Sequence, residues 1–394
     1  MAFDVARARR DTPGCAQVLH FNNAGSALMP QSVLDAQIEH LRLEASMGGY
    51  EAADVAHASI ERVYTAAGEL IGCAPSEIAV IENATRAWDM AFYSIPFESG
   101  DRILTAQSEY ASNYIAYLHV AARTGAVVEA IPNDEHGQVS VAALRAMLDE
   151  RVKLIAITHV PTNGGLVNPA AEIGAVARQA NILYLLDACQ SVGQLPLNVA
   201  EIGCDMLSTT GRKYLRGPRG TGLLYVRNAI MERLEPPFLD LHAAQWTSRD
   251  EYVVRDDARR FENWETNYAA KIGLGVALDY ALEWGLPSIW DRVQTLAEAL
   301  RARLAQLPGV VVADLGSTRC GIVTFTVVGF EPAALQDAFA ERRINVTTSS
   351  PASTRLDMEA RGLSGLVRAS VHYYNSEDEI ERFCETLGAI MRAN

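Results

Sequence analysis

The sequence has little of what metal centres, disulfide scaffolds and nucleic-acid surfaces require. Its six cysteines are scattered over 394 residues, and no two of them form a Cys-x-x-Cys pair. That spacing is unlike a zinc site or a disulfide framework, so we expect reduced thiols and no structural metal. Acidic residues outnumber basic ones, which gives a formal net charge of -14, and no basic cluster stands out. A nucleic-acid partner is therefore not expected.

Long apolar runs are also absent. No stretch approaches the roughly 18 apolar residues of a membrane helix, and the opening residues lack the apolar core of a secretory signal. We therefore expect a cytoplasmic protein with no membrane partner. What the chain does have is length and apolar content. Its 394 residues, 49% of them hydrophobic, suffice for one large α/β domain and a smaller α+β domain.

Apolar periodicity predicts several elements. The expected helices cover residues 32–47, 53–71, 288–307, 332–342 and 376–393. The expected strands cover residues 78–81, 103–105, 154–158, 182–186, 205–210, 223–226, 310–312, 321–326 and 366–371. An aromatic stretch over residues 236–246 is expected to be irregular.

The stretch from Ile182 to Lys213 is the most informative. An unbroken apolar run over residues 182–186, typical of a strand buried on both faces, stops at Asp187. A second buried strand over residues 205–210 is followed by Lys213 in a glycine-rich loop. Because α/β sheets bind ligands beyond the carboxyl ends of their strands, Asp187 and Lys213 would face one crevice.

An acid and an amine at one crevice allow two interpretations. One is an exposed ion pair, which is common and contributes little to stability. The other is a site for pyridoxal phosphate (PLP), a cofactor that needs both groups. Asp187 would keep the pyridine nitrogen protonated, and Lys213 would hold the aldehyde covalently.

The surrounding motifs resemble the class V aminotransferase family of PLP enzymes, in the branch of cysteine desulfurases, selenocysteine lyases and isopenicillin N epimerase. The family's Asp-x-x-Gln matches Asp187 and Gln190, and its Ser-Gly-His-Lys matches Thr210, Gly211, Arg212 and Lys213. Its Gly-Pro-x-Gly-x-Gly matches residues 217–222. The resemblance extends from about Phe21 to Leu387.

The resemblance implies a fold-type I PLP-dependent transferase. A large domain over residues 21–275 would hold a mostly parallel seven-stranded sheet between helices. Residues 1–20 and 276–394 would form the smaller domain. The resemblance also implies a small amino-acid substrate and a homodimer whose active site lies near the subunit interface.

A phosphate site is expected where the strand at residues 78–81 leads into a helix. Unpaired amides and the helix dipole at such a start favour an anion, although Asn83 or Thr85 could equally serve only as the helix cap. The family carries Ala-Thr here, which implies Ala84 and Thr85 as ligands. Tyr110 replaces the family's stacking histidine. Its ring can stack, but its hydroxyl titrates near 10 and cannot shuttle protons at neutral pH.

The resemblance implies further cofactor contacts. Besides Lys213 and Asp187, these are Gln190, Thr210 and Arg212, either Thr162 or Asn163 beside the cofactor hydroxyl, and Thr266 on the phosphate of the neighbouring subunit. Thr266 would have to serve there because Glu265 occupies the family's threonine position in gapless register.

Two regions are implied in substrate binding. Asn23 and Ala24, with Gly25, match a family segment near the substrate carboxylate, although the tripeptide alone indicates only a turn. Arg368 begins a match to Arg-Ala-Ser-x-x-x-Tyr-Asn, whose arginine clamps that carboxylate. An arginine offers a bidentate fork that a lysine lacks, whereas a lone arginine on a strand is usually a surface residue.

One departure from the family indicates the reaction. Cysteine desulfurases carry a nucleophilic cysteine on a mobile loop before this arginine, and residues 345–354 contain none. Persulfide formation is therefore not expected, and Lys213 is the expected catalytic base for the α-proton. We predict β-elimination that cleaves a carbon-sulfur bond of a cysteine conjugate or sulfoxide. Residues 48–53 and 261–265 are also similar to the carbon-sulfur lyase of ergothioneine biosynthesis.

Alternatives stay open at this point. The same scaffold would support an aminotransferase or an epimerase. A different class, a non-catalytic PLP-fold binding protein, would be expected to lose Asp187, Lys213 or Arg368, and all three are present. Substrate choice depends on loops such as residues 239–255 and 346–361, whose conformation the sequence does not give.

Overall fold

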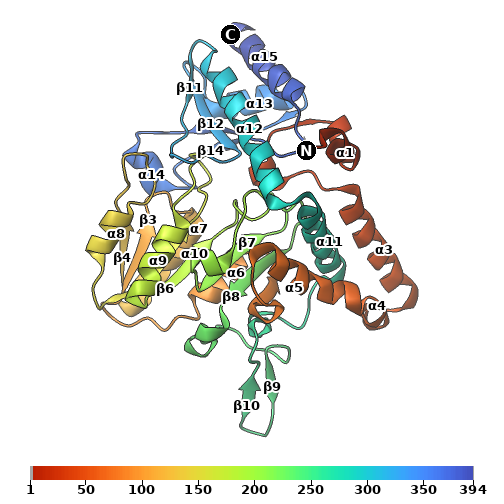
Figure 1. Cartoon of the computed structure of the whole chain (residues 1–394), viewed down its shortest axis with the longest axis vertical. Coiled ribbons are helices and arrows are strands. Elements are labelled where there is room, and N and C mark those ends of the chain that lie inside the picture. Colours follow the sequence, from red (N-terminus) through yellow and green to blue (C-terminus); the bar gives the residue numbers. More distant parts are fainter. Residues whose placement is uncertain (1–2, 394) are drawn as a thin grey trace.

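The architecture comes from a computed structural model that describes residues 3–393. A seven-stranded sheet with helices on both faces forms the centre, and a four-stranded sheet with its own helices forms one end (Figure 1). Both chain termini lie on the side of the four-stranded sheet. The mostly parallel seven-stranded sheet expected from the sequence is confirmed.

The central sheet has the spatial order β2 (Ile78–Ile81), β8 (Gly222–Val226), β7 (Met206–Thr210), β6 (Leu183–Asp187), β5 (Val152–Thr158), β3 (Arg102–Ala106) and β4 (Val127–Ile131). β8 is antiparallel to both neighbours, and all other adjacent pairs are parallel. The sequence did not predict β4. This edge strand is only partly buried, so it lacks the continuous apolar run of the central strands.

Alternate side chains of the central strands enter two separate cores. In β6, Tyr184 and Leu186 join one core, and Leu183 and Leu185 join the other. The first core includes residues of α5 (His57–Ile71), α9 (Ala170–Ala180) and α11 (Tyr268–Trp284). The second includes residues of α6 (Ala84–Phe92) and α7 (Ala111–Thr124). Burial of both faces explains why the strand sequence is uniformly apolar.

The single helix expected over residues 53–71 is wrong. The chain forms α4 (Gly49–Val55) and α5, which are separated at Ala56. The two pieces have different neighbours, because α4 packs on α3 (Gln31–Met47) whereas α5 packs on α11. The remaining helices of this part are α1 (Val5–Arg10), α2 (Asn23–Ser26), α8 (Val141–Met147) and α10 (Val199–Ile202).

The second sheet is antiparallel, in the order β11 (Val310–Val312), β12 (Ile322–Val327), β15 (Leu366–Ser370) and β14 (Thr347–Ser349). Its helices are α12 (Leu286–Ala305), α13 (Pro332–Ala340), α14 (Arg355–Ala360) and α15 (Glu377–Ala393). Short β1 (Leu19–His20) pairs with β13 (Ile344–Asn345). The predicted domain boundary at residue 275 falls within α11, and the division into domains stays a prediction.

A two-stranded hairpin extends from the end of the molecule opposite the four-stranded sheet (Figure 1). It pairs β9 (Ala244–Trp246) with β10 (Tyr252–Val254), so the irregular stretch expected over residues 236–246 is wrong at its end. Trp246 lies opposite Tyr252, and an aromatic cross-strand pair stabilises such a ribbon. The Trp246 side chain is 79% exposed.

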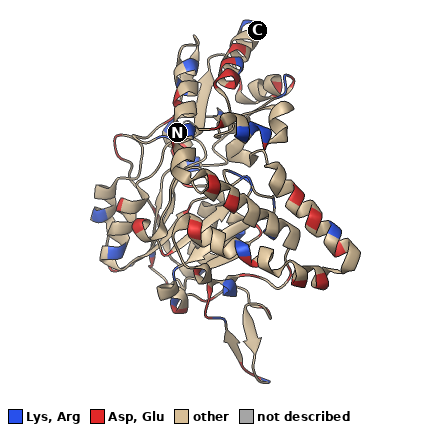
Figure 2. Ribbon diagram, turned by 45° about the vertical axis from the view of Figure 1, so that its right-hand side comes forward, with Lys and Arg blue, Asp and Glu red and all other residues tan. Residues whose placement is uncertain are grey.

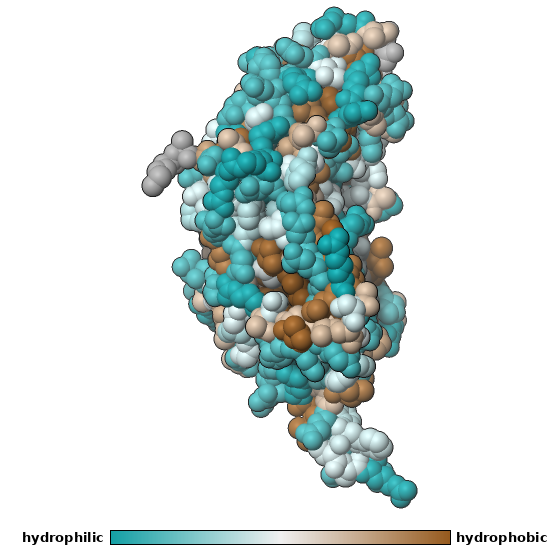
Figure 3. All heavy atoms as spheres, turned by 90° about the vertical axis from the view of Figure 1, so that its right-hand side faces the viewer, coloured by the Kyte–Doolittle hydropathy of each residue, from teal (hydrophilic) through white to brown (hydrophobic). Residues whose placement is uncertain are grey.

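The surface distributes charge and apolar side chains differently. Acidic and basic residues are intermixed over the outer helices (Figure 2). Apolar atoms are exposed across the middle of the face shown in Figure 3. Among the helices of residues 3–393, none combines the length and the apolarity that crossing a membrane requires.

Candidate active site

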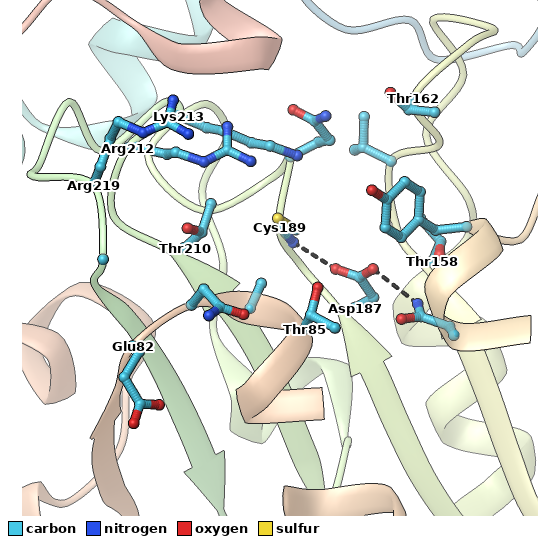
Figure 4. Close-up of a pocket in the computed structure, with 17 residues that line it drawn as sticks. Glu82, Thr85, Thr158, Thr162, Asp187, Cys189, Thr210, Arg212, Lys213 and Arg219 are labelled. Carbon is cyan, nitrogen blue, oxygen red and sulfur yellow. Dashed lines mark hydrogen bonds between the residues drawn. The ribbon is translucent and has the colours of Figure 1, made fainter. Parts of the chain in front are cut away.

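A cavity of about 340 Å³ lies beyond the carboxyl ends of β5, β6 and β7, at the first turn of α6 (Figure 4). Its lining includes these predicted site residues: Ala84, Thr85, Tyr110, Thr162, Asp187, Gln190, Thr210, Arg212 and Lys213. In Figure 4, Thr210, Arg212 and Arg219 lie on one side, Thr158 and Thr162 on the other, and Asp187 and Thr85 at the base between them.

Asp187 is held at the end of β6 by two hydrogen bonds. Its Oδ2 accepts from Asn113 Nδ2 at 2.9 Å, and its Oδ1 accepts from the backbone amide of Cys189 at 2.9 Å. Burial raises the pKa of Asp187, while these hydrogen bonds and the charge of Lys213 oppose the shift. The carboxylate is thus fixed in direction and lies in the same cavity as the lysine.

Asn113 is in turn fixed by Glu109, and neither was named as a site residue from the sequence. Glu109 Oε1 accepts from Asn113 Nδ2 at 2.9 Å and from Thr158 Oγ1, and its Oε2 accepts from Thr105 Oγ1 at 2.8 Å. Burial raises the pKa of Glu109 from 4.5 to about 7. In the sequence, Glu109 lies just before the first turn of a helix and Asn113 lies within that turn. This spacing was the signal that could have identified them as site residues.

The raised pKa of Glu109 makes stability depend on pH. The unfolded chain loses this proton near 4.5, whereas the folded protein keeps it to about 7, so raising the pH between these values favours unfolding. Across this pH range, we expect the unfolding free energy of the wild type to fall by about 3 kcal/mol relative to that of Glu109→Gln. Urea unfolding of both proteins at pH 5 and pH 8 measures the difference. An equal difference in unfolding free energy at both pH values would contradict this expectation.

Lys213 follows β7 in a loop that closes on itself. The backbone amide of Arg216 donates to the Lys213 carbonyl at 2.9 Å. Arg216 has a left-handed backbone with φ 62, and its buried guanidinium donates to the Leu28 carbonyl at 2.9 Å and the Tyr373 hydroxyl at 2.7 Å. These contacts hold the strained Arg216 in place and stabilise the backbone of the loop that carries Lys213.

The amine of Lys213 lies among other charged groups. Burial lowers the pKa of Lys213, and the nearby guanidinium groups of Arg212 and Arg368 lower it further. Asp187 and the Cys189 thiol act in the opposite direction. An amine with a lowered pKa can act as a base closer to neutral pH than an exposed lysine can.

The first turn of α6 offers groups that suit an anion. Asn83 caps this helix by accepting from the Arg86 amide at 2.9 Å, and Ala84 and Thr85 follow at its start. Thr210 and Arg212 face this turn from the end of β7 (Figure 4). Hydroxyls, a guanidinium and free helix amides together suit a phosphate group.

Thr162 and Asn163 point to different places. Thr162 lines the cavity, and its hydroxyl and carbonyl oxygens accept from Arg368 Nη1. Asn163 is fully buried and donates to Asp357 Oδ2 at 3.1 Å. Of the pair, Thr162 is thus the one placed for a cofactor contact.

Arg368 reaches Thr162 from β15 of the second sheet. Its side chain is buried, and among residues 3–393 its Nε has no hydrogen-bond partner. Burial lowers the pKa of Arg368 to about 10. A buried guanidinium nitrogen without an acceptor is costly, and a substrate carboxylate would supply one.

Five predicted residues do not line this cavity, namely Asn23, Ala24, Asn163, Thr266 and Arg368. Asn23 Nδ2 donates to the Ser370 carbonyl at 2.7 Å, and the Ala24 carbonyl accepts from Gln190 Nε2 at 3.2 Å. Thr266 lines a neighbouring cavity of about 310 Å³. The substrate contacts of Asn23 and Ala24 and the partner contact of Thr266 stay predictions.

A family profile described as aminotransferase class V matches residues 19–383. The chain belongs to the class V aminotransferases. A probable cysteine desulfurase of Methanothermobacter thermautotrophicus is 29% identical over 97% of this chain and 97% of its own. One of Synechocystis sp. is 30% identical over 98% of this chain and 96% of its own.

Solved structures agree with the family. An apo cysteine desulfurase from Thermococcus onnurineus NA1 superposes with a TM-score of 0.92 at 25% identity, covering 100% of this chain and 99% of that one. The cystine C-S lyase C-DES, solved with cysteine persulfide, gives 0.87 at 25% identity, covering 96% and 99%. This chain therefore has the fold-type I architecture and is a cysteine desulfurase-like PLP enzyme.

The cavity fits this cofactor. The first turn of α6, with Thr210 and Arg212, would hold the phosphate, and Asp187 would face the ring nitrogen. Gln190 Oε1 is buried without a hydrogen-bond partner in the described chain, so the cavity presents an acceptor that the ring hydroxyl would satisfy. Tyr110 lies at the opening, where its half-exposed ring could stack on the cofactor.

Proposed function

We propose that this class V enzyme is a carbon-sulfur lyase that eliminates the β-substituent of a cysteine conjugate or sulfoxide without a cysteine nucleophile. One observation carries the proposal. Lys213 and Asp187 line a single cavity and Arg368 donates to Thr162 of the same lining, whereas residues 345–354, the position of the desulfurase nucleophile, contain no cysteine. The chain thus offers candidates for the base and the carboxylate clamp, but residues 345–354 offer no thiolate.

Each residue has a separate task in this proposal. When bound, PLP withdraws electrons from the substrate's α-carbon. Asp187 keeps the ring nitrogen cationic, which strengthens that withdrawal. Arg368 binds the substrate carboxylate and directs the α-hydrogen toward the amine of Lys213. Lys213 Nζ takes the α-proton, and the sulfur substituent then leaves the β-carbon.

The products test the proposal. PLP-loaded protein is incubated with S-alkyl cysteines and their sulfoxides, and we expect pyruvate, ammonia and the released sulfur compound in equal amounts. Free cysteine is tested in parallel, and its conversion to alanine with protein-bound persulfide would indicate desulfuration. Conversion of the cofactor to its pyridoxamine form would indicate transamination, and inverted substrate would indicate epimerisation. No reaction with any amino acid would favour a binding protein.

We further propose that two copies associate, with the site near their interface. Apolar side chains are exposed on α3 and α4 and include Leu41 at 52% and Tyr50 at 71%. Exposed apolar patches of this kind mark association surfaces. Sedimentation of the PLP-loaded protein should give twice the mass of one chain, and a single-chain mass would contradict this. Since all six cysteines, each within the described residues, are free, we propose a cytoplasmic location.

A further inference from the structure

Residues 350–361, here called the bridging segment, lead from β14 through a turn into α14 and contact two loops beside the cavity. The Ser353 carbonyl accepts from the Ala111 amide at 2.9 Å. Asp357 Oδ2 accepts from Asn163 Nδ2 at 3.1 Å. Tyr110 and Thr162 line the cavity. Ala111 directly follows Tyr110, and Asn163 directly follows Thr162. The bridging segment thus ties down both loops.

The contact at Asp357 is a buried one. Its side chain is 3% exposed, and the same oxygen accepts from Arg361 Nη1 at 3.1 Å. Arg361 also donates to the Ala313 carbonyl, beside the second sheet. A buried carboxylate is tolerated only where donors compensate its lost hydration, so Asn163 and Arg361 are held firmly in place.

The next link leads to Arg368. Asn163 fixes the backbone of Thr162, whose carbonyl and hydroxyl oxygens both accept from Arg368 Nη1. We infer that Asp357 is a positioning residue: through Asn163 and Thr162 it sets the direction of the Arg368 guanidinium toward the substrate carboxylate. The bridging segment then acts as a fixed support of the carboxylate site. This inference rests on the carboxylate role of Arg368 in the proposed function.

Two small amines that differ only in a carboxylate test the inference. Glycine and methylamine are titrated into PLP-loaded protein, and their dissociation constants are read from the visible absorbance. We expect Asp357→Ala to weaken glycine about tenfold, because a misdirected clamp loses much of its binding, and to leave methylamine unchanged. The control is Glu359→Ala, which removes an exposed carboxylate paired with Arg355 on the same helix and should change neither constant.

Two more variants make each outcome decisive. Asn163→Ala leaves Asp357 paired with Arg361 and cuts the link to Thr162, so it should reproduce the glycine defect even if Asp357→Ala fails to fold. Equal weakening of both amines, or of neither, in a folded Asn163→Ala protein would overturn the inference. Arg368→Ala tests the carboxylate role of Arg368 separately from the positioning role of Asp357. If Arg368→Ala does not weaken glycine more than methylamine, the proposed carboxylate site is wrong. If Arg368→Ala weakens glycine more than methylamine but Asn163→Ala does not, Arg368 binds the carboxylate as proposed, and the positioning role of Asp357 is wrong.

Discussion

Lys213→Ala is expected to lower kcat for carbon-sulfur cleavage by about 10³-fold, because the variant loses the proposed base for the α-proton. The amine lies in the cavity with Asp187 and is directed there by the closed loop after β7. Burial first, and then Arg212 and Arg368, lower the pKa of Lys213. Wild-type kcat should therefore rise with pH through a midpoint below that of an exposed lysine, and the variant should lose this rise.

The sequence offers a sharp control for this experiment. The chain has only three lysines, Lys153, Lys213 and Lys271. Lys271 donates to the Tyr64 hydroxyl and pairs with Glu262, outside the cavity, and Lys153 lies on β5 near its amino end. Lys153→Ala should keep kcat, its pH profile and the visible absorbance of the cofactor. Borohydride reduction and peptide mapping should place the cofactor mass on the Lys213 peptide. Mass on another lysine, or full activity of Lys213→Ala, would contradict the assignment.

The positions of Asp187 and Lys213 could be predicted because each ends a buried apolar run. Parallel strands bring such endings to one edge of the sheet, and the structure places both in one cavity. The central strands themselves were predictable for the same reason, since a strand covered on both faces is apolar throughout. Edge strand β4 and the exposed hairpin were not predicted, because half-buried strands lack that signal.

The surroundings of the site depend on contacts between distant segments. Arg368 comes from β15 of the second sheet and reaches Thr162 in the loop after β5, so only a family motif could suggest the pairing. Neighbours such as Thr162 and Asn163 could not be told apart, since tertiary packing decides which of two loop residues faces the cavity. Asn113 was missed because it lies on α7, whereas its partner Asp187 ends β6, far away in the sequence. The bridging segment was missed because nothing local indicates that Asp357 is buried.

Asp187→Asn is the second large effect we expect, with kcat lowered by about 10²–10³-fold. Asparagine has nearly the same shape, and its oxygen can still accept from the Cys189 amide, so the fold around β6 should persist. The variant loses the negative charge that we propose keeps the ring nitrogen cationic. The electron withdrawal that acidifies the α-hydrogen is then expected to be weaker, although the proposed phosphate ligands Thr85 and Thr210 are unchanged. PLP should still bind, but proton removal should be slow.

A matched buried carboxylate separates this electronic effect from a loss of stability. Asp205 is 6% exposed and accepts from the Tyr184 amide at 2.9 Å, near the amino ends of the strands that carry Asp187 and Lys213. Asp205→Asn should lower Tm at unchanged kcat, whereas Asp187→Asn should lower kcat and slow exchange of the α-hydrogen of glycine with deuterium. The exchange isolates proton removal from all later steps. If Asp187→Asn exchanges this hydrogen at the wild-type rate, its carboxylate does not support the ring charge and the proposed task of Asp187 is wrong.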